Sequence, residues 1–329
     1  MQISESTGTD ERISQLSAET PSLLEAAAVP GMTVALLENS KTREVLCFGT
    51  TEPHGSTPIT EQTIFKCASL SKQALLYAAL KTIEAGKLDV DQPLAHYLDR
   101  PFAADDSALA RITARHVLTH TTGWRNWPPD GELITRIAPL SEQWTYSGMG
   151  FLYLQEALAS LWNEPAALYL QRLVLDPLDM PQSSFLWRDE YNETAADGFD
   201  PDGNIPDDSR WYPTEVNTGG SLHTTAREYA RLLAAFLEPS LRLRHPDVYQ
   251  KQIGIDERLG WSLGWGTADD DILWQWGFHV AFSAFAALVP ARGLGIVVLT
   301  NGTNGSRIYR EWVSAWLEAD LPDFPTRGV

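Results

Sequence analysis

Cysteine is scarce in this sequence: the 329 residues include only Cys47 and Cys67. Two cysteines cannot form a disulfide framework, so we expect two buried free thiols, although a single bridge stays open. The chain also lacks an apolar run long enough to cross a membrane. Its first residues show neither the basic nor the apolar region of a secretory signal. We therefore expect a cytoplasmic protein, with a periplasmic or secreted location open if a signal was removed.

Basic residues are also few, with 25 Lys and Arg against 43 Asp and Glu and a formal net charge of -18. Such a surface repels phosphates, which argues against nucleic acid and anionic membranes as partners. Many acidic residues fall between positions 189 and 208, and Asp200-Pro201-Asp202-Gly203-Asn204 resembles part of a calcium loop. The closing glutamate of such a loop is missing. We interpret the segment as a solvated acidic loop, with calcium as the lesser alternative, and expect no metal and no cofactor.

The apolar patterns place strands near both ends of the chain and helices in the middle. We predict strands at 31–37, 43–49, 259–266, 272–276, 282–289 and 295–301, and helices at 10–28 (interrupted at Pro21), 69–85, 112–118 (with Thr113 as its N-cap), 150–160, 166–178, 225–236 and 307–319. This order favours one antiparallel sheet built from both termini and flanked by helices, with an inserted helical region, which is an α+β fold. We expect a single domain over 1–329, with an α/β subdomain at about 1–75 and 250–329 and a mostly helical subdomain at about 76–249.

Ser69 and Lys72 form a Ser-x-x-Lys tetrapeptide at the start of a strongly helical run. Residues three apart share one helix face, so the Ser69 hydroxyl and the Lys72 amine can meet. The first helical turn also favours a developing anion. Serine is a weak nucleophile until a neighbouring base takes its proton, and a desolvated lysine has a lowered pKa that suits it to this task. A capped helix with a solvated lysine is the plainer alternative, because the tetrapeptide is common.

Two further segments carry groups suited to the same chemistry. Tyr146 precedes a Gly-containing turn that leads into a helix, so its hydroxyl can project into a cleft, where a nearby ammonium would ease its ionisation and let it relay protons. Gln275, Trp276 and Gly277 lie on a predicted strand, where backbone N–H groups can stabilise an oxyanion and Gly277 permits close approach of a substrate. A buried tyrosine and an ordinary aromatic strand are the corresponding structural alternatives.

Taken in order, the motifs resemble the serine hydrolase family of class C β-lactamases, D,D-carboxypeptidases, D-aminopeptidases and related esterases. The matching segments share their order with that family and span most of the chain: Pro30-Gly31, Thr63 through Lys72, Gly86 through Pro93, Ile112 through Gly123, Tyr146-Ser147-Gly148, Gly219 through Ala226, and Gln275-Trp276-Gly277. The resemblance implies a β-lactamase/transpeptidase-like fold. It also implies that Ser69 is the acylated nucleophile, that Lys72 and Tyr146 share the acid–base work, and that the backbone N–H groups of Ser69 and Phe278 form the oxyanion hole.

The same resemblance assigns His120 a structural role, and it sets His279 at the cleft mouth, within reach of a substrate. Two positions depart from the family pattern. Gly148 stands where the family has an asparagine that contacts the substrate amide, and Gln275 stands where it has a Lys or His that helps to bind a carboxylate. Loss of a charge-assisted hydrogen bond costs about 1.5–3 kcal/mol. Recognition of β-lactams and D-Ala-D-Ala termini should therefore weaken about tenfold or more.

Several aromatic residues fall in or beside segments that line the site in this family: Trp124, Trp127, Trp144, Trp211, Tyr212 and Trp276. Aromatic walls suit apolar or ring-bearing groups, although core packing explains some of these residues. We predict an esterase that forms an acyl-enzyme at Ser69 on small or aromatic esters. A β-lactamase, D,D-peptidase or D-aminopeptidase acting on amide bonds, an acyltransferase, and a non-catalytic binding module with the same fold remain alternatives. The oligomeric state is not predicted.

Overall fold

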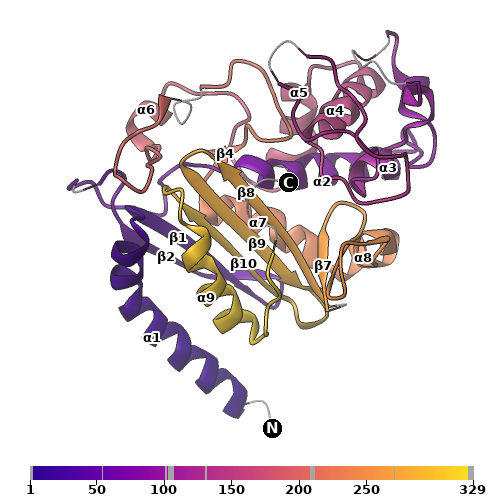
Figure 1. Ribbon diagram of the computed structural model, residues 1–329. Coiled ribbons are helices and arrows are strands. Elements are labelled where there is room, and N and C mark those ends of the chain that lie inside the picture. The colour runs from indigo at the N-terminus through magenta and orange to yellow at the C-terminus, as the bar shows by residue number, and fades with distance from the viewer. Residues whose placement is uncertain are drawn as a thin grey trace.

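The computed structural model describes residues 3–53, 55–100, 102, 107–129, 132–207, 212–269 and 271–324. Its centre is an eight-stranded antiparallel sheet with the strand order β2-β1-β10-β9-β8-β7-β6-β5 (Figure 1). The strands are β1 (Gly31–Glu38), β2 (Lys41–Gly49), β5 (Ile253–Gly254), β6 (Leu259–Trp261), β7 (Gly266–Ala268), β8 (Ile272–His279), β9 (Phe282–Val289) and β10 (Leu294–Thr300). A separate two-stranded ladder joins β3 (Phe65–Lys66) to β4 (His223–Thr224).

Strand β1 joins the two ends of the chain. It pairs on one side with β2 and on the other with β10, so Val34 lies opposite both Leu46 and Val298. Its residues are buried from Gly31 through Leu37, as expected for a central strand covered on both faces. The predicted α+β fold with one sheet from both termini is thereby confirmed.

The helices cover the two faces of the sheet. Successive strand residues point to opposite faces: Val34 and Leu36 belong to a core with α9, whereas Ala35 and Leu37 belong to a core with α7. Figure 1 shows α1 and α9 together on one face and α2 between the sheet and helices α4 and α5. The helices are α1 (Ile3–Ala27), α2 (Ser71–Glu84), α3 (Ala114–Leu118), α4 (Gly148–Trp162), α5 (Ala166–Leu170), α6 (Tyr191–Thr194), α7 (Ala226–Leu237), α8 (Pro239–Arg244) and α9 (Ser306–Leu317).

Three predicted elements differ in the structure by more than their end residues. The helix predicted at 166–178 is α-helical only as α5 and continues as a π-helix, Gln171–Leu175. Helix α1 continues through Pro21 without interruption, because its buried face packs against α9 and the Trp312 indole donates to Thr20 Oγ1 at 3.2 Å. Tertiary packing therefore offsets the local cost of the proline. The predicted strand at 259–266 is two strands, β6 and β7, separated by a turn in which Gly264 has a φ of +98°. Glycine adopts that conformation without the strain that a side chain would add.

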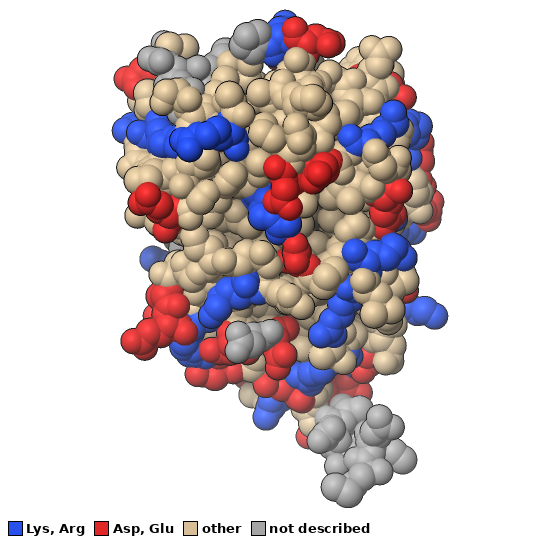
Figure 2. Space-filling view, turned by 90° about the vertical axis from the view of Figure 1, so that its right-hand side faces the viewer, with Lys and Arg blue, Asp and Glu red and all other residues tan. Residues whose placement is uncertain are grey.

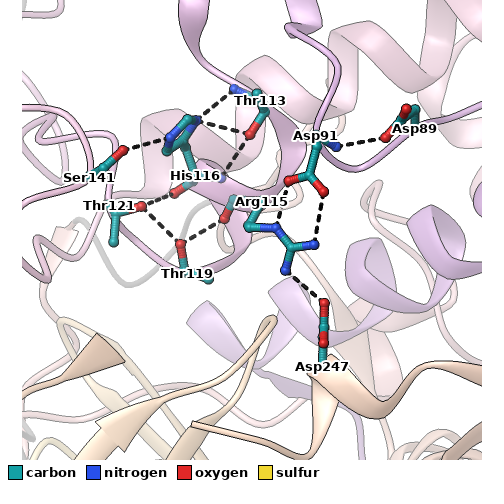
Figure 3. Close-up of polar contacts among 9 residues, drawn as sticks. All are labelled: Asp89, Asp91, Thr113, Arg115, His116, Thr119, Thr121, Ser141 and Asp247. Atoms are coloured by element: carbon teal, nitrogen blue, oxygen red, sulfur yellow. Dashed lines mark hydrogen bonds and ion pairs between the residues drawn. The ribbon is translucent and has the colours of Figure 1, made fainter. Parts of the chain in front are cut away.

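An ion-pair network ties α3 to neighbouring loops (Figure 3). Thr113 caps α3, as predicted, by accepting a hydrogen bond from the backbone N–H of His116. The Arg115 guanidinium donates to both carboxylate oxygens of Asp91, at 2.6 and 3.0 Å, and to Asp247 at 2.7 Å. Planar bidentate pairing of this kind suits arginine. The network joins the turn after α2 to the segment that precedes β5.

The charged side chains, the two cysteines and the acidic loop can each be compared with what the sequence led us to expect. Basic and acidic side chains alternate over the face shown in Figure 2, so the negative net charge is not gathered into one patch there. Cys47 and Cys67 are free thiols, as predicted, but only Cys67 is buried, whereas Cys47 on β2 is half-buried. Asp200 Oδ1 accepts hydrogen bonds from the N–H groups of Asp202 and Asn204. Within the described ranges, no helix is long and apolar enough to cross a membrane, and no cluster of three His, Cys, Asp or Glu side chains is arranged to hold a metal.

Candidate active site

Ser69 lies on a short 3-10 turn, Ala68–Leu70, that runs directly into α2. The prediction put it in the first turn of the helix itself. Ala68 has a φ of +46°, a left-handed conformation that costs a non-glycine residue about 1–2 kcal/mol. The buried Ser71 hydroxyl supports the turn, because it donates to Ala68 O at 2.6 Å and accepts from the backbone N–H of Leu222 at 2.9 Å. The strained turn therefore holds Ser69 half-exposed, and the hydrogen bonds of Ser71 fix the turn to Leu222.

Lys72 reaches Ser69 from the first turn of α2. Its Nζ donates to Ser69 Oγ at 2.9 Å and to Gly219 O at 2.8 Å, and the side chain is 1% exposed. Its ammonium also faces the Tyr146 ring, 4.8 Å from the ring centre. Burial lowers the pKa of Lys72 to about 7, since desolvation disfavours the charged amine. A large share of Lys72 is thus a neutral amine at neutral pH, able to accept the Ser69 proton.

Tyr146 completes this group from the segment before α4. Its hydroxyl accepts a hydrogen bond from Gln275 Nε2 at 3.0 Å and interacts with Ser69. The expectation that its phenol ionises easily is wrong. Burial raises the pKa of Tyr146 and outweighs the hydrogen bonds from Ser69 and Gln275 that lower it. Tyr146 therefore keeps its proton at neutral pH and is suited to donate it.

His120 holds the Tyr146 segment in place. Its ring centre lies 4.3 Å from that of Tyr146, its Nδ1 accepts from the Ser147 N–H at 3.1 Å, and its carbonyl accepts from the Thr145 N–H at 2.7 Å. Burial, followed by the charge of Lys72, lowers the pKa of His120 well below its usual value. A neutral histidine packed behind Tyr146 fits the structural role that the resemblance implies.

Strand β8 brings the third motif to Ser69. A Cβ built at Gly277 would lie 2.2 Å from Cys67 O and 3.2 Å from Ser69 N, so only glycine lets β8 pack against the serine turn. The close approach that Gly277 allows in this structure is to the serine turn, and its contact with a substrate stays a prediction. It sets Phe278 beside Ser69 in the lining of one cleft. The two backbone segments expected to form an oxyanion hole therefore meet.

Gln275 is fully buried, with no exposed surface. Its Nε2 donates to Tyr146 and to the carbonyl of Trp276, at 3.1 Å. The hydrogen bonds of its side-chain amide in this structure are thus with the protein. The prediction that Gln275 contacts substrate is untested.

The cleft that contains Ser69 has a volume of about 590 Å³. The described residues that line it are Ala68, Ser69, Trp127, Asp207, Asn217, Gly219, Gly220, Phe278, His279 and Val280. This lining includes no Lys or Arg, and Asp207 adds negative charge. His279 lies at the cleft, as expected, and Trp127 is its aromatic wall, 41% exposed. Asn217, Asp207 and the supporting role of Ser71 were missed by sequence reasoning, and only the position of Ser71 inside the Ser-x-x-Lys motif offered a signal.

Other predicted aromatic contacts lie elsewhere. Trp124 does not line the cleft, because it is fully buried and stacks against Phe102, 6.2 Å between ring centres. Trp276 is also buried, and its ring lies 4.6 Å from that of Tyr146. Tyr212 is half-exposed and packs on Trp187 over a neighbouring cavity. Trp124 and Trp276 thus belong to the core, which is the structural alternative for aromatic residues, whereas Tyr212 lies at the surface. Trp211 falls outside the described residues.

Comparison with known proteins agrees with this geometry. A family model described as "Beta-lactamase" matches residues 10–319. A β-lactamase of Pseudomonas fluorescens is 21% identical over 328 residues, covering 85% of this chain and 90% of that protein. Esterase EstB of Burkholderia gladioli is 28% identical over 168 residues, 42% of each chain. The solved β-lactamase/D-alanine carboxypeptidase of Pseudomonas syringae has a TM-score of 0.80 at 16% identity, covering 95% of this chain and all of that one.

The fold is thus of the β-lactamase/transpeptidase-like class, an antiparallel sheet between helices, with Ser69 on a turn that packs against strand β8. The chain belongs to the Beta-lactamase family of serine hydrolases, since the family model covers most of it. Some curated relatives are longer: one from Alkalihalophilus pseudofirmus is matched over 50% of its own length, so the chain spans about half of it.

Proposed function

We propose that this protein is a carboxylesterase that forms an acyl-enzyme at Ser69 and acts on small or aromatic esters. The observation that carries the proposal is the composition of the cleft. Ser69 lies in a cleft with the Trp127 indole, and it is hydrogen-bonded to Lys72, whose pKa is lowered by burial. The described lining of this cleft offers no basic side chain for a substrate carboxylate. The similarity to esterase EstB of Burkholderia gladioli also supports an esterase activity.

The residues suggest a sequence of proton transfers. Lys72 as a neutral amine takes the Ser69 proton while Ser69 Oγ attacks the ester carbonyl. Backbone N–H groups of Ser69 and Phe278 stabilise the developing oxyanion. Tyr146, which holds its proton, donates to the departing alcohol and is reprotonated through Lys72. Water then attacks the acyl carbon while Lys72 takes its proton, and the bond between Ser69 Oγ and the acyl carbon breaks as Lys72 returns that proton to Ser69 Oγ, which releases the acid.

Hydrolysis of a panel of p-nitrophenyl esters tests the proposal. We expect turnover by the wild type, loss of turnover in Ser69→Ala, and labelling of Ser69 by a fluorophosphonate probe. Ser56→Ala, at an exposed serine in the loop after β2, is the matched control and should keep both activities. Unchanged turnover in Ser69→Ala would refute the mechanism, and absence of labelling and of turnover in the wild type would favour a non-catalytic binding module.

An amide-cleaving activity is the second candidate. The names of the Pseudomonas relatives favour it, because they describe β-lactamase and D-alanine carboxypeptidase activities. A penicillin adduct on Ser69 that forms and clears within minutes would support this candidate over the esterase. A slow adduct, or none, together with rapid ester turnover would support the esterase.

A further inference from the structure

Trp127 occupies space that side chains at two other positions would need. A Cβ built at Gly148 would lie 2.2 Å from Trp127 Cζ2 and 2.5 Å from Cη2. A Cβ at Gly219 would lie 2.7 Å from the same Cη2. Carbon atoms in real structures do not approach this closely, so a side chain at either glycine would displace the indole.

The two glycines stand next to the groups expected to carry the chemistry. Gly148 is two residues after Tyr146, and the carbonyl of Gly219 accepts a hydrogen bond from Lys72 Nζ at 2.8 Å. The benzo ring of Trp127 therefore rests on backbone that directly adjoins Lys72 and Tyr146. It presents a flat apolar surface to the cleft that contains Ser69.

The position of Trp127 is set by its own segment. Asn126, its neighbour, accepts a hydrogen bond from the Gly148 N–H through Oδ1 at 2.8 Å, and its carbonyl accepts from the Met149 N–H at 3.2 Å. These bonds tie the Trp127 loop to the first turn of α4. The glycine at 148 and the indole at 127 thus form one packed unit.

The polar side chain of Asn217 lies beside the Trp127 indole in the cleft lining. Asn217 Oδ1 accepts a hydrogen bond from the Gly219 N–H at 2.9 Å, which fixes the amide beside Trp127 in the cleft lining. Its hydrogen-bond donors belong to the Nδ2 end of the amide. The cleft therefore combines an aromatic plane with one amide group, and its described lining carries Asp207 as its only charged carboxylate.

We infer that Trp127 determines substrate choice at Ser69: its indole takes the space of a side chain at position 148 and selects esters with a planar aromatic substituent. This inference rests on the proposed esterase function and names its substrate class. Stacking on an aromatic plane stabilises ring-bearing groups beyond area burial alone. A substrate whose recognition requires a polar side chain at position 148 loses that contact.

Substrate selectivity in Trp127 variants tests the inference. With p-nitrophenol as the constant leaving group, we expect the benzoate-to-acetate ratio of kcat/KM to fall about tenfold in Trp127→Ala, the scale of a lost apolar contact. Trp127→Phe keeps a ring and should hold the ratio within about threefold. Leu243→Ala, which truncates an exposed apolar side chain on α8, should not change it. The phenyl-to-ethyl acetate ratio extends the comparison to the alcohol side, and unchanged ratios in both series for Trp127→Ala would overturn the inference.

A double variant tests the packing of Trp127 on Gly148 directly. Gly148→Asn alone should lower the thermal midpoint by several degrees and reduce ester hydrolysis, because the new side chain meets the indole. The combined Gly148→Asn and Trp127→Ala variant should regain the midpoint of Trp127→Ala, since the indole no longer fills the space. A wild-type midpoint and selectivity in Gly148→Asn alone would overturn the inference.

Failure of the esterase proposal would be visible separately. If the wild type hydrolyses no ester, the proposed function fails, whereas the thermal midpoints of the single and double variants still report on the Trp127–Gly148 packing. If the wild type hydrolyses esters but the ratios do not respond to Trp127, the function stands and the assignment of Trp127 fails.

Discussion

The side-chain amide of Gln275 donates a hydrogen bond to the hydroxyl of Tyr146 at 3.0 Å, and both residues are buried. The acceptor Tyr146 interacts in turn with Ser69. Gln275 thus acts on Tyr146 from behind the cleft, and through it on Ser69. This hydrogen bond favours a positioning role for Gln275 over direct contact with a substrate, and kinetics of Gln275 variants separate the two roles.

Gln275→Ala should lower kcat about tenfold with little change in KM, because the lost hydrogen bond, about 1–1.5 kcal/mol, acts on the proton donor rather than on bound substrate. Steady-state kinetics on p-nitrophenyl acetate measure this split. Gln275→Met, which retains the length of the side chain but has no hydrogen-bond donor, should share the defect. A rise in KM at unchanged kcat would instead make Gln275 a substrate-binding residue.

Activity should depend on pH through Lys72, whose pKa burial lowers to about 7. The base is competent when neutral, so kcat/KM should rise with pH, reach half of its plateau near pH 7, and fall about tenfold per unit at lower pH. Lys72→Met should remove this limb along with about 10²–10⁴-fold of the rate. A wild-type profile that is flat from pH 5 to 9 would exclude Lys72 as the base.

Tyr146→Phe should reduce kcat by about 10²-fold or more, the usual range for loss of a positioned proton donor. The fold should persist, because the ring keeps its contacts with His120 and Trp276. Circular dichroism and a thermal scan control for folding. Since burial raises the pKa of Tyr146, the wild type should show no loss of activity from phenol ionisation below pH 9, and such a loss would contradict its role as donor.

Arg115→Ala should destabilise the protein without a direct effect on catalysis. Arg115 joins Asp91 and Asp247 in the network of Figure 3. Partly exposed ion pairs contribute about 0.2–1 kcal/mol each, so we expect the thermal midpoint to fall by about 2–4 °C. Asp91→Asn should produce a similar decrease, and added salt should shrink the difference from wild type. Equal midpoints at low salt would show that the network contributes nothing to stability.

Much of the fold follows from local patterns. The continuous apolar run at 31–37 and the segment at 295–301 predicted buried strands, and β1 and β10 are paired neighbours. Thr113 was predicted to cap α3 and does. Pro21 and the segment 259–266 were predicted incorrectly, because contacts with α9 and the turn at Gly264 arise from packing and backbone conformation that hydrophobic periodicity does not encode.

The sequence alone determined that Ser69 and Lys72 could meet, because residues three apart on a helical turn share a face, and the structure shows them hydrogen-bonded at 2.9 Å. It also determined that both ends of the chain would supply one sheet, since each carries strands long and apolar enough to be buried. Tertiary structure decided the rest. In the sequence, Gly148 shows only that the asparagine of the family pattern is absent, whereas the fold places the Trp127 indole against it. In the same way, Gln275 shows only that the cation of the family pattern is absent, whereas the fold joins its side chain to Tyr146 by a hydrogen bond. Such contacts join residues far apart in the chain, and only three-dimensional packing brings them together.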